Sequence, residues 1–429
     1  MDSARRQNFD VLVIGGGPAG IAAAACAAES GVKTGIVDDN PSLGGQIWRG
    51  ASHEKNSDAH PWLARLHRSG AKIICGTKIV HHPHPGRLLG ETFHAACELG
   101  YEHLVLATGA RERLLPFPGW TLPNVMGAGG LQALVKSGLP ISGKRVVVAG
   151  TGPLLLAVAA YLRKAGAHVP LVCEQASWTS LAKFAGSLLG QPQKIWQGLS
   201  LRRELGGASF VPNCWPIAAE GDTRVEAVVI SKNGKTERIP CDYLACGFYL
   251  LPNSEMAKLL GCQVRENFVV VDEFQQTSVS GIYCAGEPTG IAGVEASLVE
   301  GQIAGLAASG KTALAEKMFQ VRDKWHKFRA SLNRAFALRA ELRDLPRPET
   351  IVCRCEDVPF ARMQQYNTWR NAKLQTRSGM GPCQGRICGS AAEFLFGWDT
   401  GAVRPPLFPA QLGNLAAVPK ELKEQPLAN

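Results

Sequence analysis

The chain has 429 residues, of which 45% are hydrophobic and 19% are charged. One hydrophobic core rarely covers this length, and the composition is that of a globular α/β protein, so we expect two or three domains and exclude intrinsic disorder. The net charge of +10 suits an acidic partner, but no nucleic-acid-binding module is present and we expect no nucleic-acid partner.

The N-terminal sequence MDSARRQNFD leads directly into the apolar stretch VLVIGGG. We find no signal-peptide core with a cleavage site and no apolar run of about 18 residues, so we expect a cytoplasmic protein without a transmembrane segment. Thirteen cysteines in such a chain are expected to be reduced thiols.

Residues 9–40, FDVLVIGGGPAGIAAAACAAESGVKTGIVDDN, predict a strand, a glycine turn, an Ala-rich helix and a second strand. A G-x-G-x-x-G turn at this place lets a dinucleotide pyrophosphate approach the backbone at the helix N-terminus. An acid at the end of the second strand accepts hydrogen bonds from ribose hydroxyls. The expected binding residues are Gly15, Gly17, Pro18, Ala19, Gly20 and Asp38, with Asp39 as the competing acid.

The same pattern recurs in residues 143–175. Gly150 and Gly152 occupy the first two glycine positions and Glu174 the acidic one, but Leu155 stands where the third glycine belongs. A leucine there requires a different packing of helix and strand. Three alternatives remain open for this second unit: NAD(P)H, another adenine nucleotide, or no nucleotide.

Four cysteines lie within 36 residues, in IVCRCEDV (351–358) and GMGPCQGRICG (379–389). A [2Fe–2S] cluster needs four thiolates, and its sulfides accept from backbone N–H groups such as those that the flanking glycines expose. Zinc also takes four thiolates but usually from C-x2–4-C pairs, and two disulfides suit a secreted protein. We expect an iron–sulfur centre, with zinc as the alternative, on Cys353, Cys355, Cys383 and Cys388.

These motifs make the chain similar to the two-dinucleotide-binding-domain flavoproteins, the group of glutathione reductase and thioredoxin reductase. PSLGGQIWRG, LVLATGAR and GIYCAGEPTG add to the resemblance, which implies FAD. The residues that it implies are Gly44, Gly45, Gln46, Thr108, Gly109, Gly286 and Glu287, with Glu287 replacing the usual Asp. The redox cysteine pair of the disulfide reductases is missing beside the flavin segment, so we do not expect thiol–disulfide reduction.

The cysteine segments resemble the bacterioferritin-associated-ferredoxin-type [2Fe–2S] module. Behind this flavoprotein frame, they resemble the α subunits of bacterial multi-subunit amino-acid dehydrogenases, the group of D-hydroxyproline dehydrogenase, opine oxidase and hydrogen cyanide synthase. The resemblance implies that a flavin-bearing β subunit oxidises the substrate and that the α subunit relays electrons. A small ferredoxin-like subunit can join such a complex.

Three further segments carry predictions. HHPHP, residues 81–85, has three histidines that suggest a metal site, but its prolines favour an exposed polar turn, which we predict. Residues 291–305 predict a helix whose N-terminus points at the flavin. RPPLFPAQ, residues 404–411, predicts an extended arm that lies on a neighbouring subunit.

We therefore predict an α/β fold with two Rossmann-like, glutathione-reductase-like domains and a small C-terminal helical [2Fe–2S] module. The expected parts are an FAD domain (1–115 and 246–310), a nucleotide-like domain (116–245), a helical connector (311–350), the [2Fe–2S] module (351–400) and an extended tail (401–429). The predicted function is electron relay in an amino-acid dehydrogenase. The alternatives are a self-contained NAD(P)H-dependent reductase of a ferredoxin-like acceptor and a scaffold with structural cofactors. No catalytic residue, substrate, acceptor or stoichiometry is predicted.

Overall fold

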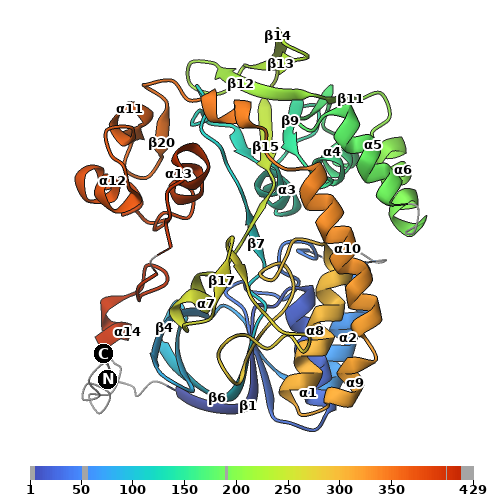
Figure 1. The fold of residues 1–429 in the computed structure, drawn as a ribbon, viewed down its shortest axis with the longest axis vertical. Coiled ribbons are helices and arrows are strands. Elements are labelled where there is room, and N and C mark those ends of the chain that lie inside the picture. The colour runs from blue at the N-terminus through green and yellow to red at the C-terminus, as the bar shows by residue number, and fades with distance from the viewer. Residues whose placement is uncertain (1–4, 51–56, 189–191, 402, 417–429) are drawn as a thin grey trace. The chain divides into compact units, whose positions relative to one another are not determined.

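A computed structural model describes residues 5–50, 57–188, 192–401 and 403–416 (Figure 1). The chain divides into two compact units. The first unit contains Met1–Ala110, Pro252–Lys327 and Ala402–Asn429, and the second contains Arg111–Leu251 and Phe328–Gly401. The five-part division expected from the sequence stays a prediction.

The first unit is built on a seven-stranded sheet in the order β3-β2-β1-β6-β5-β4, with β19 beside β6. The strands from β3 to β6 and β19 run parallel, whereas β5 and β4 are antiparallel to their neighbours. β1 carries a run of Val, Leu and Ile because both of its faces are buried. The strands are β1 (Arg5–Ile14), β2 (Thr34–Val37), β3 (Lys72–Ile74), β4 (Lys78–His84), β5 (Arg87–Glu91), β6 (Ala96–Leu106), β17 (Val264–Arg265), β18 (Phe268–Val269) and β19 (Ile282–Cys284). The helices are α1 (Pro18–Glu29), α2 (Ala59–Ser69), α7 (Glu255–Leu259), α8 (Val294–Ala308), α9 (Thr312–Glu316) and α14 (Leu412–Ala416).

Helices α1 and α8 pack against each other at unusually close range (Figure 1). The facing residues are small: a Cβ atom built on Gly301 would lie 2.2 Å from the Ala19 carbonyl oxygen, and one on Gly305 would lie 2.2 Å from that of Ala23. Side chains cannot approach a carbonyl oxygen so closely. The glycines of α8 therefore hold it against the helix that begins at the first glycine turn.

Replacing Gly301 by alanine is expected to lower the free energy of unfolding of this unit by about 2 kcal/mol, because the new methyl group overpacks the α1 contact. Calorimetric or circular-dichroism melting of the purified chain measures the effect. Gly186 in α5 is the matched control, because a Cβ atom there meets nothing within 4 Å. Gly186→Ala should leave the melting temperature unchanged or raise it. Equal melting of the Gly301 variant and the wild type would contradict the packing argument.

The prediction for HHPHP was wrong, because His81–His84 are the end of β4 and only Pro85 lies in the turn that follows. Pro83 is tolerated since β4 is the edge strand, where a missing N–H breaks no ladder bond. The predicted arm on a neighbouring subunit was also wrong. Leu407 is buried in the core of its own unit, and its backbone N–H donates to Val80 O at 2.8 Å. Residues 404–411 thus cover the open edge of their own sheet; the tail after 416 lies outside the described residues.

The second unit contains a five-stranded parallel sheet in the order β11-β10-β9-β15-β8 and an antiparallel meander, β12-β13-β14. β9 lies between β10 and β15, so the strand order reverses beside it, and ligands of open α/β sheets bind at such a point. The strands are β8 (Val125–Gly127), β9 (Val146–Thr151), β10 (Leu171–Glu174), β11 (Ser209–Pro212), β12 (Cys214–Glu220), β13 (Ala227–Lys232), β14 (Lys235–Pro240) and β15 (Tyr243–Phe248). The helices are α3 (Ala128–Lys136), α4 (Leu154–Lys164), α5 (Trp178–Ser187) and α6 (Pro192–Glu204). The short strands β7 (Ala110–Glu112) and β16 (Leu250–Pro252) pair where the chain passes between the units.

The C-terminal part of the second unit is a small helical module. Its core contains Val352, Met363, Trp369, Ala392 and Trp398. The elements are the 3-10 helix η2 (Ala340–Asp344), β20 (Ile351–Cys353), β21 (Val358–Pro359), α11 (Phe360–Met363), α12 (Trp369–Thr376) and α13 (Cys388–Phe396); α10 (Phe319–Ala335) leads into it. No helix in the described ranges is long and apolar enough to cross a bilayer.

Candidate cofactor-binding sites

The first glycine turn connects β1 to α1 and has the shape of a phosphate cradle. Gly15 has φ +108°, and a Cβ atom there would lie 2.2 Å from the Ala107 carbonyl oxygen, so the turn requires glycine. At Gly17 the Cβ position is open, since the nearest atom is Gly45 Cα at 4.0 Å. Pro18 is the first residue of α1, and its missing N–H costs nothing there. The open space above Gly17 fits a pyrophosphate at the N-terminus of this helix.

Asp38 lies at the end of β2 and is buried beneath this turn. Its Oδ2 accepts a hydrogen bond from Gly16 N, and its Oδ1 accepts from Asn40 N at 2.7 Å and Asn40 Nδ2 at 2.8 Å. The neighbouring Asp39 is exposed, and its Oδ1 accepts from Asn40 Nδ2 at 2.9 Å. Of the two candidate acids, Asp38 is therefore the one that the fold holds at the turn. Asn40, which fixes its carboxylate, was not predicted.

The predicted segments from elsewhere in the chain meet at the same turn. Gly44 N donates to Gly16 O at 2.8 Å, and a Cβ atom on Gly45 would lie 2.9 Å from Gly17 Cα, whereas Gln46 is exposed. Gly286 faces the first turn of α1, since a Cβ atom built on it would lie 2.9 Å from the Ala19 Cβ atom. The site is thus assembled from three regions that are distant in the sequence.

Thr108 and Gly109 form hydrogen bonds with Asn253 at the point where the chain leaves the sheet. Thr108 Oγ1 donates to Asn253 O at 2.6 Å, and Asn253 Nδ2 donates to Thr108 O at 2.9 Å. Asn253 N also donates to Gly109 O at 2.9 Å. These bonds join the outgoing and returning strands of the first unit, and they occupy the Thr108 hydroxyl.

Glu287 follows Gly286 and has a carboxylate that no donor reaches within the described part of the chain. Burial raises the pKa of Glu287 to about 7. A half-buried acid without a protein partner is costly and is a common mark of a ligand site. The glutamate in place of the usual aspartate therefore still presents a free acceptor beside the turn.

The stability of the FAD-free chain should depend on the protonation of Glu287. The folded chain keeps this proton up to about pH 7, whereas the unfolded chain releases it near pH 4.5, so stability falls as the pH rises between these values. The loss amounts to at most about 3 kcal/mol. We expect denaturant unfolding to show that the free energy of unfolding of Glu287→Gln, relative to that of the wild type, is higher at pH 8 than at pH 5. A variant that follows the wild type at both pH values would show that Glu287 is solvated.

Glu300 supports this corner of the site and was not predicted. It is only 2% exposed, and its Oε2 accepts from Gly286 N at 2.9 Å and from Thr289 Oγ1 at 2.8 Å. His326 Nε2 lies 3.4 Å from its Oε1. An acid in the middle of the apolar helix α8 was the signal in the sequence that could have identified it.

The second glycine turn, after β9, is filled by protein groups. Glu174 is 1% exposed and accepts from Thr151 Oγ1 at 2.7 Å, from Gly152 N at 2.8 Å and from Ala176 N at 2.8 Å. Burial, opposed by these bonds, raises the pKa of Glu174 to about 7. Gly150 is packed against Gly247, and Leu155 is buried in the core between α4 and the sheet. The leucine at the third glycine position is therefore a core residue.

The four predicted cysteine ligands come together in the C-terminal module. Cys353 ends β20 and Cys388 begins α13, and both are buried, whereas Cys355 is exposed and Cys383 is half-buried. Cys388 is hydrogen-bonded to the sulfurs of Cys353 and Cys383, and Cys383 contacts Cys355. The fold therefore joins the C-x-C and C-x4-C pairs into one group of sulfurs.

Hydrogen bonds favour the thiolate form at two of these four cysteines, Cys353 and Cys383. The pKa of Cys388, which bonds to both of their sulfurs, is raised, and that of Cys355 is raised as well. The bond with Cys388 lowers the pKa of Cys353 to about 6 and that of Cys383 to about 4. Backbone N–H groups of Gly379 and Gly385 also bond to Cys353 and Cys383, respectively. With the sulfurs in mutual contact, the described residues contain no group of three or more His, Cys, Asp or Glu side chains arranged around a metal ion. Four cysteine sulfurs are the donor set that a thiolate-bound cluster requires.

The two arginines beside the cysteines have distinct surroundings. The Arg354 guanidinium lies 5.1 Å from the centroid of the Trp120 ring, and Trp120 Nε1 donates to Ile351 O at 2.6 Å. Arg386 Nη1 donates to Gln384 Oε1 at 2.9 Å. Both cations thus lie next to the cysteine segments.

A comparison with known protein families identifies the family of this chain. Residues 9–305 match the family model described as pyridine nucleotide-disulphide oxidoreductase. The chain belongs to this family. Membership confirms the flavoprotein frame and implies FAD. The family model ends before the cysteine module, so it leaves the [2Fe–2S] cluster and the contacts of each site residue as predictions.

Relatives within the pyridine nucleotide-disulphide oxidoreductase family narrow the group. The chain is 31% identical to hydrogen cyanide synthase subunit HcnB of Pseudomonas protegens over 89% of this chain and 90% of that one. It is 30% identical to an opine oxidase subunit of Rhizobium meliloti over 96% and 88%. The predicted membership of this oxidoreductase group is confirmed.

Solved structures show the same fold. L-proline dehydrogenase from P. horikoshii superimposes with a TM-score of 0.69 at 22% identity, over 97% of this chain and 81% of that one. Thioredoxin reductase from T. acidophilum gives 0.55 at 20% identity, over 71% and 99%. The first match covers nearly the whole chain, whereas the second covers only part of it.

Proposed function

We propose that this chain is the electron-relaying subunit of a hetero-oligomeric dehydrogenase that oxidises an amino acid or secondary amine of the D-hydroxyproline, proline or opine type. A separate flavin-bearing subunit would oxidise the substrate, and a small ferredoxin-like subunit can take part. The relatives are named as subunits of opine oxidase and of hydrogen cyanide synthase, and these names support a multi-subunit assembly.

The observation that carries the proposal is the grouping of four cysteine sulfurs on a chain whose other unit holds a dinucleotide cradle. When bound, FAD exchanges electrons singly or in pairs and an iron–sulfur cluster exchanges them one at a time. This combination suits conversion between the two kinds of transfer. None of the thirteen cysteines forms a disulfide in the structure, which supports a reducing compartment such as the cytoplasm.

The chain's own residues would divide the binding work. Gly17 leaves room for the pyrophosphate, Asp38 stabilises the glycine turn, and Glu287 offers an acceptor to a ribityl hydroxyl. Glu300 holds the backbone that places Glu287. In the module, Cys353, Cys355, Cys383 and Cys388 would hold the cluster, with the Gly379 and Gly385 N–H groups stabilising thiolate charge.

Purification of the chain alone and with its natural companion subunits tests the proposal. The complex should reduce a dye with D-hydroxyproline, proline or an opine, whereas the chain alone should not. Visible spectra should show flavin and [2Fe–2S] absorption that substrate bleaches only in the complex, and electron paramagnetic resonance should then show the signal of the reduced cluster. Full-rate substrate oxidation by the isolated chain, or a module that holds zinc, would overturn the proposal.

A further inference from the structure

The second nucleotide fold, the five-stranded parallel sheet of the second unit with its helices, has strand ends that contact another part of the same chain. In an open parallel sheet, a dinucleotide lies across the carboxyl ends of the strands at the point where their order reverses. Here those ends are Thr151 of β9, Glu174 of β10, Pro212 of β11 and Phe248 of β15. Three residues that directly follow these strands, Gln175 after β10, Asn213 after β11 and Tyr249 after β15, contact one segment of the chain itself. From here on, connector means this segment, residues 328–344, which contains the end of α10 and η2.

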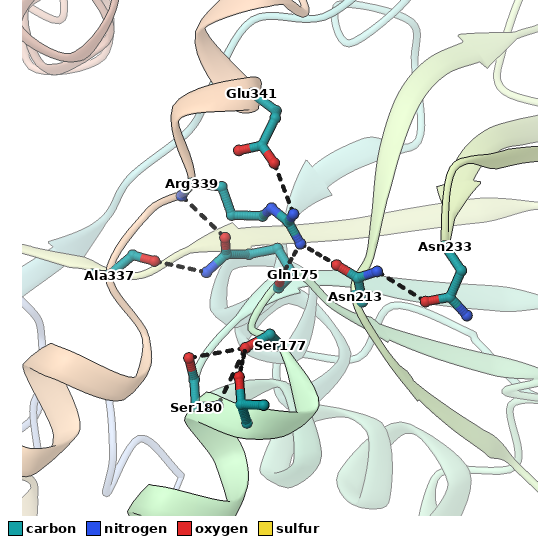
Figure 2. A network of polar contacts seen from close by, with 9 residues as sticks. Gln175, Ser177, Ser180, Asn213, Asn233, Ala337, Arg339 and Glu341 are labelled. Atoms are coloured by element: carbon teal, nitrogen blue, oxygen red, sulfur yellow. Dashed lines mark hydrogen bonds and ion pairs between the residues drawn. The ribbon is translucent and has the colours of Figure 1, made fainter.

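Gln175, directly after β10, is the first anchor of the connector. Its side chain is fully buried: Nε2 donates to Ala337 O at 3.1 Å and to Thr151 Oγ1 at 3.0 Å. Its Oε1 accepts from Arg339 N at 3.1 Å. Figure 2 shows the Gln175 amide bonded to Ala337 and Arg339 of the connector backbone. Because the same amide donates to Thr151, it connects the threonine of the glycine turn to the connector.

Arg339 is the second anchor, and Figure 2 shows its side chain among Gln175, Asn213 and Glu341. Its guanidinium donates to Gln175 O at 3.2 Å, to Asn213 Oδ1 and to Glu341 Oε1 at 2.7 Å. The same group lies 4.3 Å from the centroid of the Trp215 ring. Asn213 follows β11, so one connector arginine reaches the ends of two adjacent strands, β10 and β11.

Tyr249 closes the glycine turn from the other side. Its ring comes within 3.6 Å of the Cβ position of Gly152, where a pyrophosphate would approach the backbone. Its hydroxyl donates to Asn333 Oδ1 in α10. Phe336, after α10, also packs edge-to-face on Phe184 of α5 with ring centroids 5.3 Å apart. The connector and Tyr249 therefore occupy the edge at which a dinucleotide would lie.

We propose that the second nucleotide fold has become an anchor for the connector and does not take NAD(P)H. The connector continues into the cysteine module: Leu342 of η2 is fully buried in the core of the fold, and Arg343 Nε donates to Phe394 O of α13 at 3.0 Å. The fold thus fixes the position of the module through a segment that occupies its own ligand edge. This inference does not depend on the identity of the substrate or on the relay function.

Two measurements on the complete chain test the anchor. Isothermal titration of the unmodified protein with NADH and with NADPH should show no saturable binding up to about 1 mM. In hydrogen exchange, Arg339→Ala should speed exchange of residues 336–345 at least about tenfold, because the guanidinium's bonds to Gln175 O, Asn213 Oδ1 and Glu341 Oε1 are lost. Arg339→Lys should give an intermediate rate, since a lysine keeps the charge and loses the forked geometry.

Lys235→Ala, in the exposed strand β14, is the control for the exchange experiment and should change nothing in residues 336–345. Micromolar binding of NADH or NADPH by the unmodified chain would overturn the proposal, as would unchanged connector exchange in Arg339→Ala. The titration uses the unmodified protein, so it gives a result even if Arg339→Ala fails to fold.

Discussion

A chain in which alanine replaces Gly17 is expected to fold normally and to lose at least about 100-fold in FAD affinity, equivalent to about 2.8 kcal/mol. Gly17 has an extended backbone with φ −79°, which alanine adopts without strain, and its Cβ position meets no atom closer than 4.0 Å. The added methyl group would project into the space over the turn that a pyrophosphate needs. Flavin content and fluorescence titration of the apoprotein measure the affinity.

Gly20→Ala provides the contrast for this experiment. A Cβ atom there would lie 1.8 Å from the Gly15 carbonyl oxygen, so the substitution should damage the fold and the flavin content together. Melting curves of both FAD-free variants separate the two effects. If Gly17→Ala binds FAD like the wild type, the cradle that we assign to the first unit is wrong.

Replacement of Cys388 by serine should remove the iron–sulfur signal and lower substrate-linked turnover of the assembled complex at least about 100-fold. Cys388 is the sulfur that contacts both Cys353 and Cys383, so its loss disrupts the group at its centre. Flavin content should stay unchanged, because FAD is expected in the other compact unit. Iron analysis and electron paramagnetic resonance report the cluster, and steady-state assays report turnover.

Cys75→Ser is the matched control, since Cys75 is a half-buried thiol in the first unit and belongs to no sulfur group. It should keep iron, flavin and turnover. A Cys388→Ser complex with full turnover but without iron would make the metal centre structural. Stoichiometric zinc in the wild type would replace the cluster by the alternative that the cysteine spacing left open.

Local patterns in the sequence were sufficient to predict those parts of the nucleotide site that come from one continuous segment of the chain. The strand, glycine turn, helix and Asp38 lie within residues 5–38, and their periodicity and turn chemistry are local properties. The short spacing of the four cysteines similarly identified residues that the fold brings together. The family resemblance added Gly44, Gly45 and Gly286, which no local rule connects to the turn.

Contacts between distant segments could not be predicted in this way. Gln175 and Arg339 are 164 positions apart, and neither belongs to a motif, so only the folded chain reveals that they bind each other. Glu300 acts through the backbone of Gly286 because α8 returns to the first glycine turn. The error at HHPHP had a related cause: proline disfavours a central strand, but whether a strand lies at the edge depends on the complete sheet.

The indole of Trp120 donates to the carbonyl two residues before Cys353, and the Arg354 side chain covers its ring. This places a native fluorophore, only 4% exposed, against the strand that carries the first sulfur of the group. A metal chromophore built on that strand would quench its emission. Insertion of the cluster into the module could then be followed in a stopped-flow instrument by the decrease in tryptophan fluorescence, without a label or a protein partner.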